Sequence, residues 1–133
     1  MATLTNAILT VTRNKRKKLV NVKVTAKINF SDLELCLMKN CKKAKLFKIK
    51  AELWGEDGFL TGADDHLYTF PSVRFFPDST PSSTETVTFS DTVGEGLLDE
   101  DWGKDEVYGK VILYNYLATN SISKKTNVVK DWF

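Results

Sequence analysis

Two stretches of the chain alternate apolar and polar side chains with a period of two. Apolar side chains occupy every second position of residues 19–30, and asparagine, lysine and threonine fill the positions between them. Residues 46–54 repeat this pattern, with Lys48 and Lys50 on the polar side. Successive side chains of a strand point to opposite faces of a sheet, so both stretches predict strands with one buried and one solvated face.

Further strands are predicted at shorter runs of the same kind, at residues 7–12, 66–76, 84–90, 105–118 and 123–133. Pro71 lies inside one of these runs and lacks the amide hydrogen that a ladder needs. Residues 66–76 therefore form an edge strand or divide into two strands there. Residues 105–118 are apolar on both faces, which is typical of a central strand covered on both sides for part of its length.

Residues 31–41 depart from the strand pattern. Ser31 precedes Glu34 by three positions, which is the spacing of a capping box at the start of a helix, and Asn40 is a suitable end. We expect a short helical crossover here, and the alternative is an eighth strand. Residues 77–86 are expected to form a turn, and residues 91–104 a longer loop.

Seven or eight short strands with little helix predict an all-β fold, an antiparallel β-sandwich. The length of 133 residues and the 42% hydrophobic content suit a single domain over residues 1–133. Trp54 and Trp132 end strand patterns and are expected to cap the core. Cys36 and Cys41 are expected to be free thiols, at least one of them partly buried.

The net charge of only +2 hides a strong separation of charge along the chain. Residues 13–50 contain 13 of the 19 lysines and arginines, whereas residues 51–106 contain 14 of the 17 acidic residues. If the chain runs up and down without crossing, the basic connection 13–18 and the acidic connections 55–65 and 91–106 share one end of the sandwich.

The acidic connections are candidates for a calcium site, because calcium is bound by six to eight oxygen atoms from carboxylates, carbonyls and water. Acidic loops at one end of a sandwich resemble the C2-type calcium-binding sandwiches in layout. That resemblance implies calcium-dependent binding to a membrane or a glycan, as an alternative to ordinary solvated turns. The ligands predicted for such a site are Asp57, Asp64, Asp65, Asp99 and Asp101.

The basic connection and an aromatic residue in the second acidic loop are the predicted contacts to a partner; they are Arg13, Lys15, Arg16, Lys17, Lys18 and Trp102. Charge-segregated surfaces favour association with a protein of complementary charge, including a second copy. A membrane surface is another candidate. Phe30 and Phe47 fall on the core side of the lysine-bearing strands, which argues against nucleic acid, since single-strand binders need exposed aromatic residues.

No arrangement of residues in the sequence indicates catalysis. The single histidine, His66, follows two aspartates, but no G-x-S-x-G nucleophile motif or glycine-rich phosphate loop is present. We therefore expect a non-enzymatic binding or assembly module without a small-molecule substrate. The first residues lack the charge order of a signal peptide and no run of 18 apolar residues occurs, so the expected location is the cytoplasm.

Overall fold

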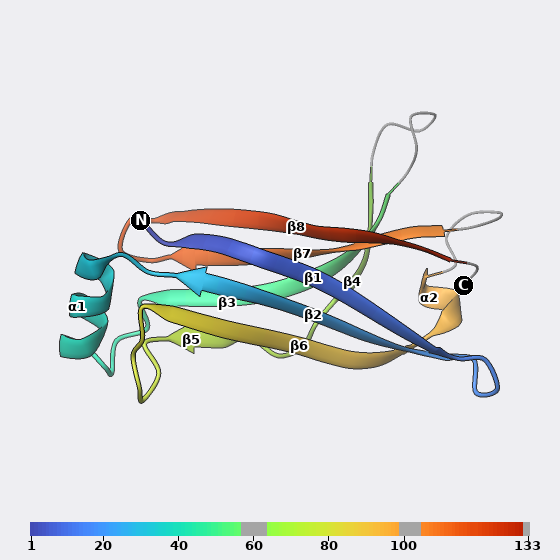
Figure 1. Ribbon diagram of the computed structural model, residues 1–133, viewed down its shortest axis with the longest axis horizontal. Coiled ribbons are helices and arrows are strands. Elements are labelled where there is room, and N and C mark those ends of the chain that lie inside the picture. Colours follow the sequence, from blue (N-terminus) through green and yellow to red (C-terminus); the bar gives the residue numbers. More distant parts are fainter. Residues whose placement is uncertain (57–63, 99–104, 132–133) are drawn as a thin grey trace.

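The computed structural model describes residues 1–56, 64–98 and 105–131. Eight strands and two helices follow one another within these described residues (Figure 1). In chain order they are β1 (Thr3–Asn14), β2 (Leu19–Asn29), α1 (Asp32–Asn40), β3 (Phe47–Gly55), β4 (Asp65–Thr69), β5 (Arg74–Phe76), β6 (Thr84–Gly94), α2 (Glu95–Leu98), β7 (Asp105–Asn115) and β8 (Asn120–Asp131).

The strands form two antiparallel sheets, which confirms the predicted sandwich. One sheet has three strands in the order β1-β2-β6. The other has five, in the order β4-β3-β7-β8, with β5 also paired to β3. The break at Pro71 is confirmed, because β4 and β5 pair with opposite ends of β3.

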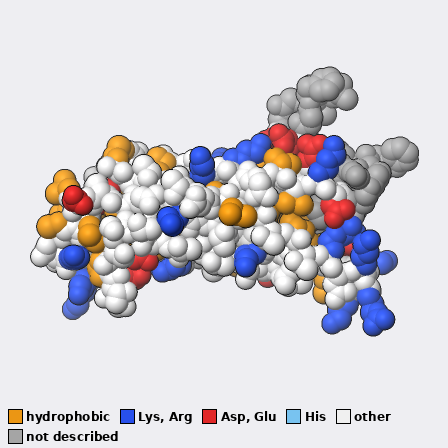
Figure 2. All heavy atoms as spheres, viewed as in Figure 1, with side chains coloured by type: hydrophobic (Ala, Val, Ile, Leu, Met, Phe, Trp, Pro, Cys, Tyr) orange, Lys and Arg blue, Asp and Glu red, His pale blue; other side chains and the backbone are white. Residues whose placement is uncertain are grey.

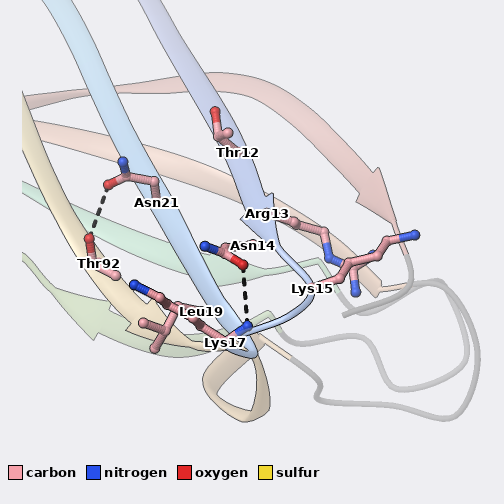
Figure 3. A pocket seen from close by; sticks show the side chains of 8 residues that line it. All are labelled: Thr12, Arg13, Asn14, Lys15, Lys17, Leu19, Asn21 and Thr92. Atoms are coloured by element: carbon pink, nitrogen blue, oxygen red, sulfur yellow. Dashed lines mark hydrogen bonds between the residues drawn. The ribbon is translucent and has the colours of Figure 1, made fainter.

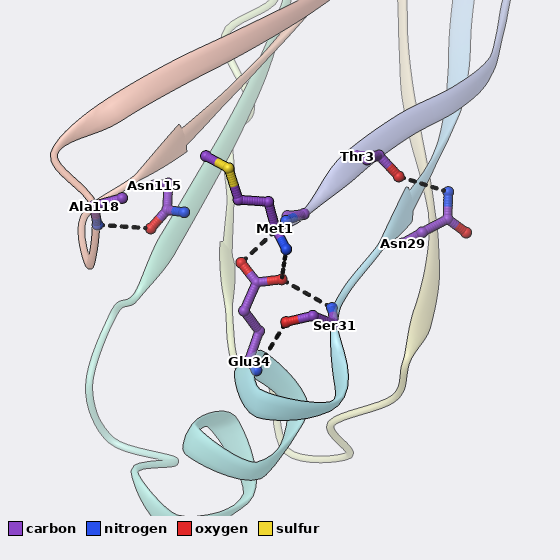
Figure 4. Close-up of polar contacts among 8 residues, drawn as sticks. Met1, Thr3, Asn29, Ser31, Glu34, Asn115 and Ala118 are labelled. Atoms are coloured by element: carbon purple, nitrogen blue, oxygen red, sulfur yellow. Dashed lines mark hydrogen bonds and ion pairs between the residues drawn. The ribbon is translucent and has the colours of Figure 1, made fainter.

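The predicted helix is confirmed together with its capping box (Figure 4). The Ser31 hydroxyl accepts a hydrogen bond from the Glu34 amide, and the Ser31 amide donates to Glu34 Oε1 at 2.8 Å. Glu34 Oε2 also accepts from the Ala2 amide at 3.1 Å. This buried carboxylate therefore ties the start of α1 to the chain entering β1.

The two alternating stretches bury the predicted side chains. The inward residues of β2 and β3 are at most 2% exposed and belong to one core cluster with Phe70, Phe76 and Phe89. The sheets approach closely at Gly109 of β7, where an added Cβ would lie 2.9 Å from Val24 Cγ2 and 3.1 Å from Thr126 Cγ2. Only glycine fits between the two sheets at this position.

Side chains close the gap between the sheets along both edges. On one edge, the Asn127 carboxamide of β8 accepts from the Leu9 amide of β1 at 2.8 Å and donates to the Leu9 carbonyl at 3.1 Å. On the other edge, the Tyr68 hydroxyl of β4 donates to the Asp91 carboxylate of β6. These contacts occupy groups that an open strand edge would otherwise present to another chain.

Three details of the prediction are wrong. Residues 91–104 are not a loop throughout, since β6 continues to Gly94 by pairing with β2 and α2 follows it. Trp54 does not cap the core, because it points to the outer face of its sheet opposite Tyr108. Cys36 and Cys41 are free but both exposed, which contradicts their predicted partial burial.

In the part of the chain that the structure describes, neither helix has the length and apolarity needed to cross a membrane.

Candidate binding surface

Aromatic and lysine side chains alternate on the outer face of the five-stranded sheet. Register pairs this side of β3 with that of β7, so Lys48 lies beside Tyr114, Glu52 beside Lys110 and Trp54 beside Tyr108. We define the aromatic–lysine face as Lys48, Lys50, Trp54, Phe75, Tyr108, Lys110, Ile112, Tyr114 and Lys125.

Lysine ammonium groups lie over the aromatic rings of this face. Lys125 Nζ is 4.2 Å from the centre of the Tyr108 ring, and Lys110 Nζ is 5.4 Å from that of Trp54. Lys48 and Lys50 both lie 5.8 Å from the ring of Tyr114. Hydrogen bonding to Tyr114 and the nearby Glu52 carboxylate raise the pKa of Lys50. Lys50 thus remains charged beside Tyr114, and the four ammonium groups attract the ring faces that they lie over.

A polar cluster borders the face where β3 meets β4. His66 Nε2 lies 2.8 Å from the Thr69 hydroxyl and 3.9 Å from Glu52 Oε2, and the Trp54 indole donates to Glu52 Oε1 at 3.2 Å. Thr69 and Glu52 therefore face the same imidazole nitrogen. A nucleophile–histidine–acid relay needs the two partners on opposite nitrogens, so these contacts do not form one.

Asp64 is engaged by the neighbouring strand. The Tyr108 hydroxyl donates to Asp64 Oδ2 at 2.6 Å, and Lys125 Nζ lies 3.3 Å from Glu56 Oε1 at the same end of the sheet. Burial raises the pKa of Tyr108 far above its ordinary value, and the hydrogen bond to Asp64 adds to this effect. The phenol therefore stays protonated and anchors the residue that enters β4.

Among the described residues, the basic connection 13–18 meets the acidic connection 91–106 as predicted, whereas most of the acidic connection 55–65 lies outside those residues. Arg13 points inward and lies 2.7 Å from Glu95 of α2 and 3.5 Å from Asp131 at the end of β8. The Glu95 amide also donates to the Lys18 carbonyl at 3.0 Å. These contacts raise the pKa of Arg13, the Glu95 hydrogen bond contributing most. Arg13 is thus bound within the molecule at this end of the sandwich.

The other predicted contact residues of the basic connection lie in the turn between β1 and β2, of which Figure 3 shows Lys15 and Lys17. Asn14 Oδ1 accepts from the Lys17 amide at 3.2 Å and shapes this turn. A hollow of about 680 Å³ opens beside it and is lined by Thr12, Arg13, Asn14, Lys15, Lys17, Leu19, Asn21 and Thr92. All four remaining basic residues of this connection are exposed; they are Lys15, Arg16, Lys17 and Lys18.

Only two of the five predicted calcium ligands, Asp64 and Asp65, lie within the described residues. Asp57, Asp99, Asp101 and the predicted contact residue Trp102 lie outside the described residues. Asp64 is hydrogen-bonded to Tyr108, and Asp65 is exposed at the start of β4. Within residues 1–56, 64–98 and 105–131, no three candidate metal ligands lie close enough to share an ion. The calcium site stays a prediction, which calorimetric titration with calcium would test.

The sequence analysis does not predict the aromatic–lysine face, because Phe30 and Phe47 of the first two alternating strands lie on the core side. Tyr108, Ile112 and Tyr114 also alternate, but an apolar outer side of β7 is equally typical of a strand covered on both faces. Tyr108 is indeed buried, whereas Ile112 and Tyr114 are half-exposed. The useful signal was Lys110 between the aromatic positions, since a lysine there requires solvent.

Comparisons with known proteins leave the chain unassigned. No family model matches the sequence, and no curated protein does. One similar solved structure is described as the X-ray structure of Northeast Structural Genomics Consortium target SoR45. It shares 9% sequence identity over 97% of this chain and 84% of the other, with a TM-score of 0.43.

Proposed function

We propose that the protein is a non-enzymatic binding module that holds an acidic protein segment on its aromatic–lysine face. The observation that carries this proposal is the juxtaposition of half-exposed Ile112 and Tyr114 with Lys48, Lys50 and Lys110 on one side of the sheet. Tyrosine and tryptophan supply much of the binding energy of protein interfaces, because they bury a large area and lose little conformational freedom.

The distribution of ion pairs supports an acidic partner. Among the described residues, most carboxylates are already used within the molecule, for example Glu95 by Arg13, Glu106 by Lys130 and Asp78 by Arg74. Lys48 and Lys110, by contrast, have no carboxylate within 4.0 Å in the part of the chain that the structure describes. The charge left available on this face is therefore positive, and complementary charge accelerates association and sets its orientation.

The proposal includes a second copy of the chain as one such partner, since the separation of charge along the sequence makes two copies complementary. A cytoplasmic location is part of the same proposal. It is supported by the two exposed free thiols, which are typical of proteins in a reducing compartment.

The test is the affinity for a fluorescent peptide of alternating glutamate and leucine, measured by anisotropy at several salt concentrations. Tyr114→Ala and Lys110→Glu should each weaken binding about tenfold, as expected for a contact worth roughly 1–2 kcal/mol. Lys23→Glu is the matched control, because Lys23 is exposed on the outer face of the three-stranded sheet. This control should bind like the wild type.

Equal weakening by Lys23→Glu would contradict the proposal, since it would reveal attraction by net charge alone. Tighter binding of a single-stranded oligonucleotide than of the peptide, lost in Tyr114→Ala, would replace the protein partner by nucleic acid. Sedimentation velocity at several concentrations addresses self-association, and a monomer throughout would remove the second copy as the partner.

A further inference from the structure

Apolar side chains are exposed together at the end of the molecule that carries α1. Leu33 of α1 is 71% exposed, and Tyr116 and Leu117, between β7 and β8, are 50% and 46% exposed. Leu33, Leu37, Leu117 and Ala118 line a hollow of about 270 Å³ at this end. Figure 2 shows hydrophobic side chains gathered here, whereas the middle of the same view is mostly uncharged and polar.

These apolar side chains are held by ordered local structure. Asn115 Oδ1 accepts hydrogen bonds from the amides of Leu117 and Ala118, at 3.0 and 3.1 Å, and so fixes the turn that presents Leu117. The Glu34 contacts to Ser31 and Ala2 fix the start of α1, as Figure 4 shows. Leu33 and Leu37 follow one helical turn apart on the flank of α1 that faces this turn.

Lysines flank the same apolar end. Lys39 lies in the last turn of α1, and Lys42, Lys43 and Lys45 follow in the connection to β3, all of them exposed. Among the described residues, no carboxylate lies within 4.0 Å of any of these four ammonium groups. Asp32 is the exposed carboxylate of α1 and leaves the local charge positive.

We propose that the α1 end docks on an anionic lipid surface. Leu33 and Leu117 enter the headgroup region, and Lys39, Lys42 and Lys43 lie near the lipid phosphates and carboxylates. Apolar insertion combined with attraction of lysines to anionic lipid is sufficient for reversible docking. A stable protein interface, in contrast, buries about 800 Å² on each partner. α1 lies at one end of the molecule's long axis (Figure 1), so this end can meet a flat lipid surface without contact by the two sheet faces.

The experiment is co-sedimentation of the full chain with phosphatidylcholine vesicles, with and without phosphatidylserine. The wild type should sediment only with the anionic vesicles. Lys42→Glu combined with Lys43→Glu should reduce binding at least about tenfold, because each lysine near an anionic surface contributes about 1 kcal/mol and reversal adds repulsion. Lys15→Glu combined with Lys17→Glu makes the same change of charge in the turn between β1 and β2, and it should leave binding unchanged.

Leu33→Ser combined with Leu117→Ser tests insertion, and both residues are exposed enough that the fold should tolerate the change. This variant should bind anionic vesicles several-fold more weakly at equal charge. Unchanged binding would overturn the proposal, as would equal losses in the two lysine pairs or equal sedimentation with neutral vesicles. Concentration-dependent dimers abolished by the leucine variant would also overturn it, in favour of a second copy on this end.

Lys110→Glu separates this inference from the proposed function. The substitution lies on the aromatic–lysine face, at a position paired with Glu52 in the interior of β3. It should weaken binding of the acidic peptide and leave vesicle binding within about twofold of the wild type. A failure of one surface therefore does not count as a failure of the other.

Discussion

The outer faces of the two sheets enclose one core but differ in chemistry. On the three-stranded sheet, Cα partners across the strands place threonine, serine and asparagine side by side, with Lys23 and Lys27 on its middle strand. On the five-stranded sheet, the equivalent positions of β3 and β7 carry lysine, tryptophan, tyrosine and isoleucine. Threonine favours strands and hydrates well. The exposed aliphatic residues of the first face, Ile8 and Leu19, lie on the edge strand β1 and at the start of β2, and the described strands place no aromatic side chain among them.

The second face has a composition that strand propensity and solubility do not explain together. Ile112 and Tyr114 are only partly buried on this face, and the aliphatic surface of Ile112 gains nothing from water. The lysines beside them shield the rings while the face is unoccupied. The two faces therefore differ in their central outward residues rather than in their number of charges.

The largest expected effect is the difference in stability between a variant of the core and a variant of the aromatic–lysine face. Phe47 is fully buried, with its ring centre 4.9 Å from that of Phe30, and Phe47→Ala should lower the free energy of unfolding by about 3–5 kcal/mol. Tyr114→Ala, on the opposite side of the same sheet, should cost about 1 kcal/mol or less. Urea unfolding checks both values, and similar losses would show that the face belongs to the structural core.

A smaller effect is expected where the two sheets press together. Gly109→Ala places a Cβ 2.9 Å from Val24 Cγ2 and should cost about 1–3 kcal/mol of stability. Gly96→Ala is the matched control, because no atom lies within 4 Å of its added Cβ. The control should be neutral or slightly stabilising, since alanine is the better helix former. Equal stability of the two variants in thermal unfolding would mean that the sheets separate easily at Gly109.

The next effect concerns the edge at which β1 meets β8. Asn127→Ala removes both hydrogen bonds to Leu9 and should cost about 1 kcal/mol, a modest value because water reaches this exposed side chain. It should also speed hydrogen exchange of the Leu9 amide. Unchanged protection of that amide would show that the edge is closed by packing alone.

The sequence predicted the parts of the fold that depend on local periodicity. Alternation over residues 19–30 and 46–54, the capping box at Ser31 and the strand break at Pro71 were all confirmed. Each depends on backbone geometry or on the two-residue repeat of a strand. The contact of the basic connection 13–18 with Glu95 of the acidic connection 91–106 also agrees with the prediction, whereas most of the acidic connection 55–65 lies outside the described residues.

Local periodicity could not predict the candidate site, because the site depends on which strands become neighbours. Lys110 and Trp54 are 56 positions apart and meet only when β7 pairs with β3. Arg13 was predicted as a partner contact from its place in a basic run, but Glu95 and Asp131 reach it through tertiary structure. Whether a charged residue is available to a partner is decided by such long-range pairs.

The smallest effect concerns the other edge, where Tyr68 and Asp91 join the two sheets. The Tyr68 hydroxyl and the Thr92 amide donate to Asp91 and lower the pKa of its carboxyl below the ordinary value of 3.8. A carboxyl group whose pKa is lower in the folded than in the unfolded state stabilises the protein at pH values above the unfolded-state pKa. This contribution is lost as the pH falls through the folded-state pKa. The stability difference between wild type and Asp91→Asn should therefore shrink between about pH 5 and about pH 2, as measured by urea unfolding. Tyr68→Phe should flatten the pH dependence in the same way. A curve for Asp91→Asn that runs parallel to that of the wild type would show that this hydrogen bond does not hold the edge closed, and that the two outer faces are kept in place by the core alone.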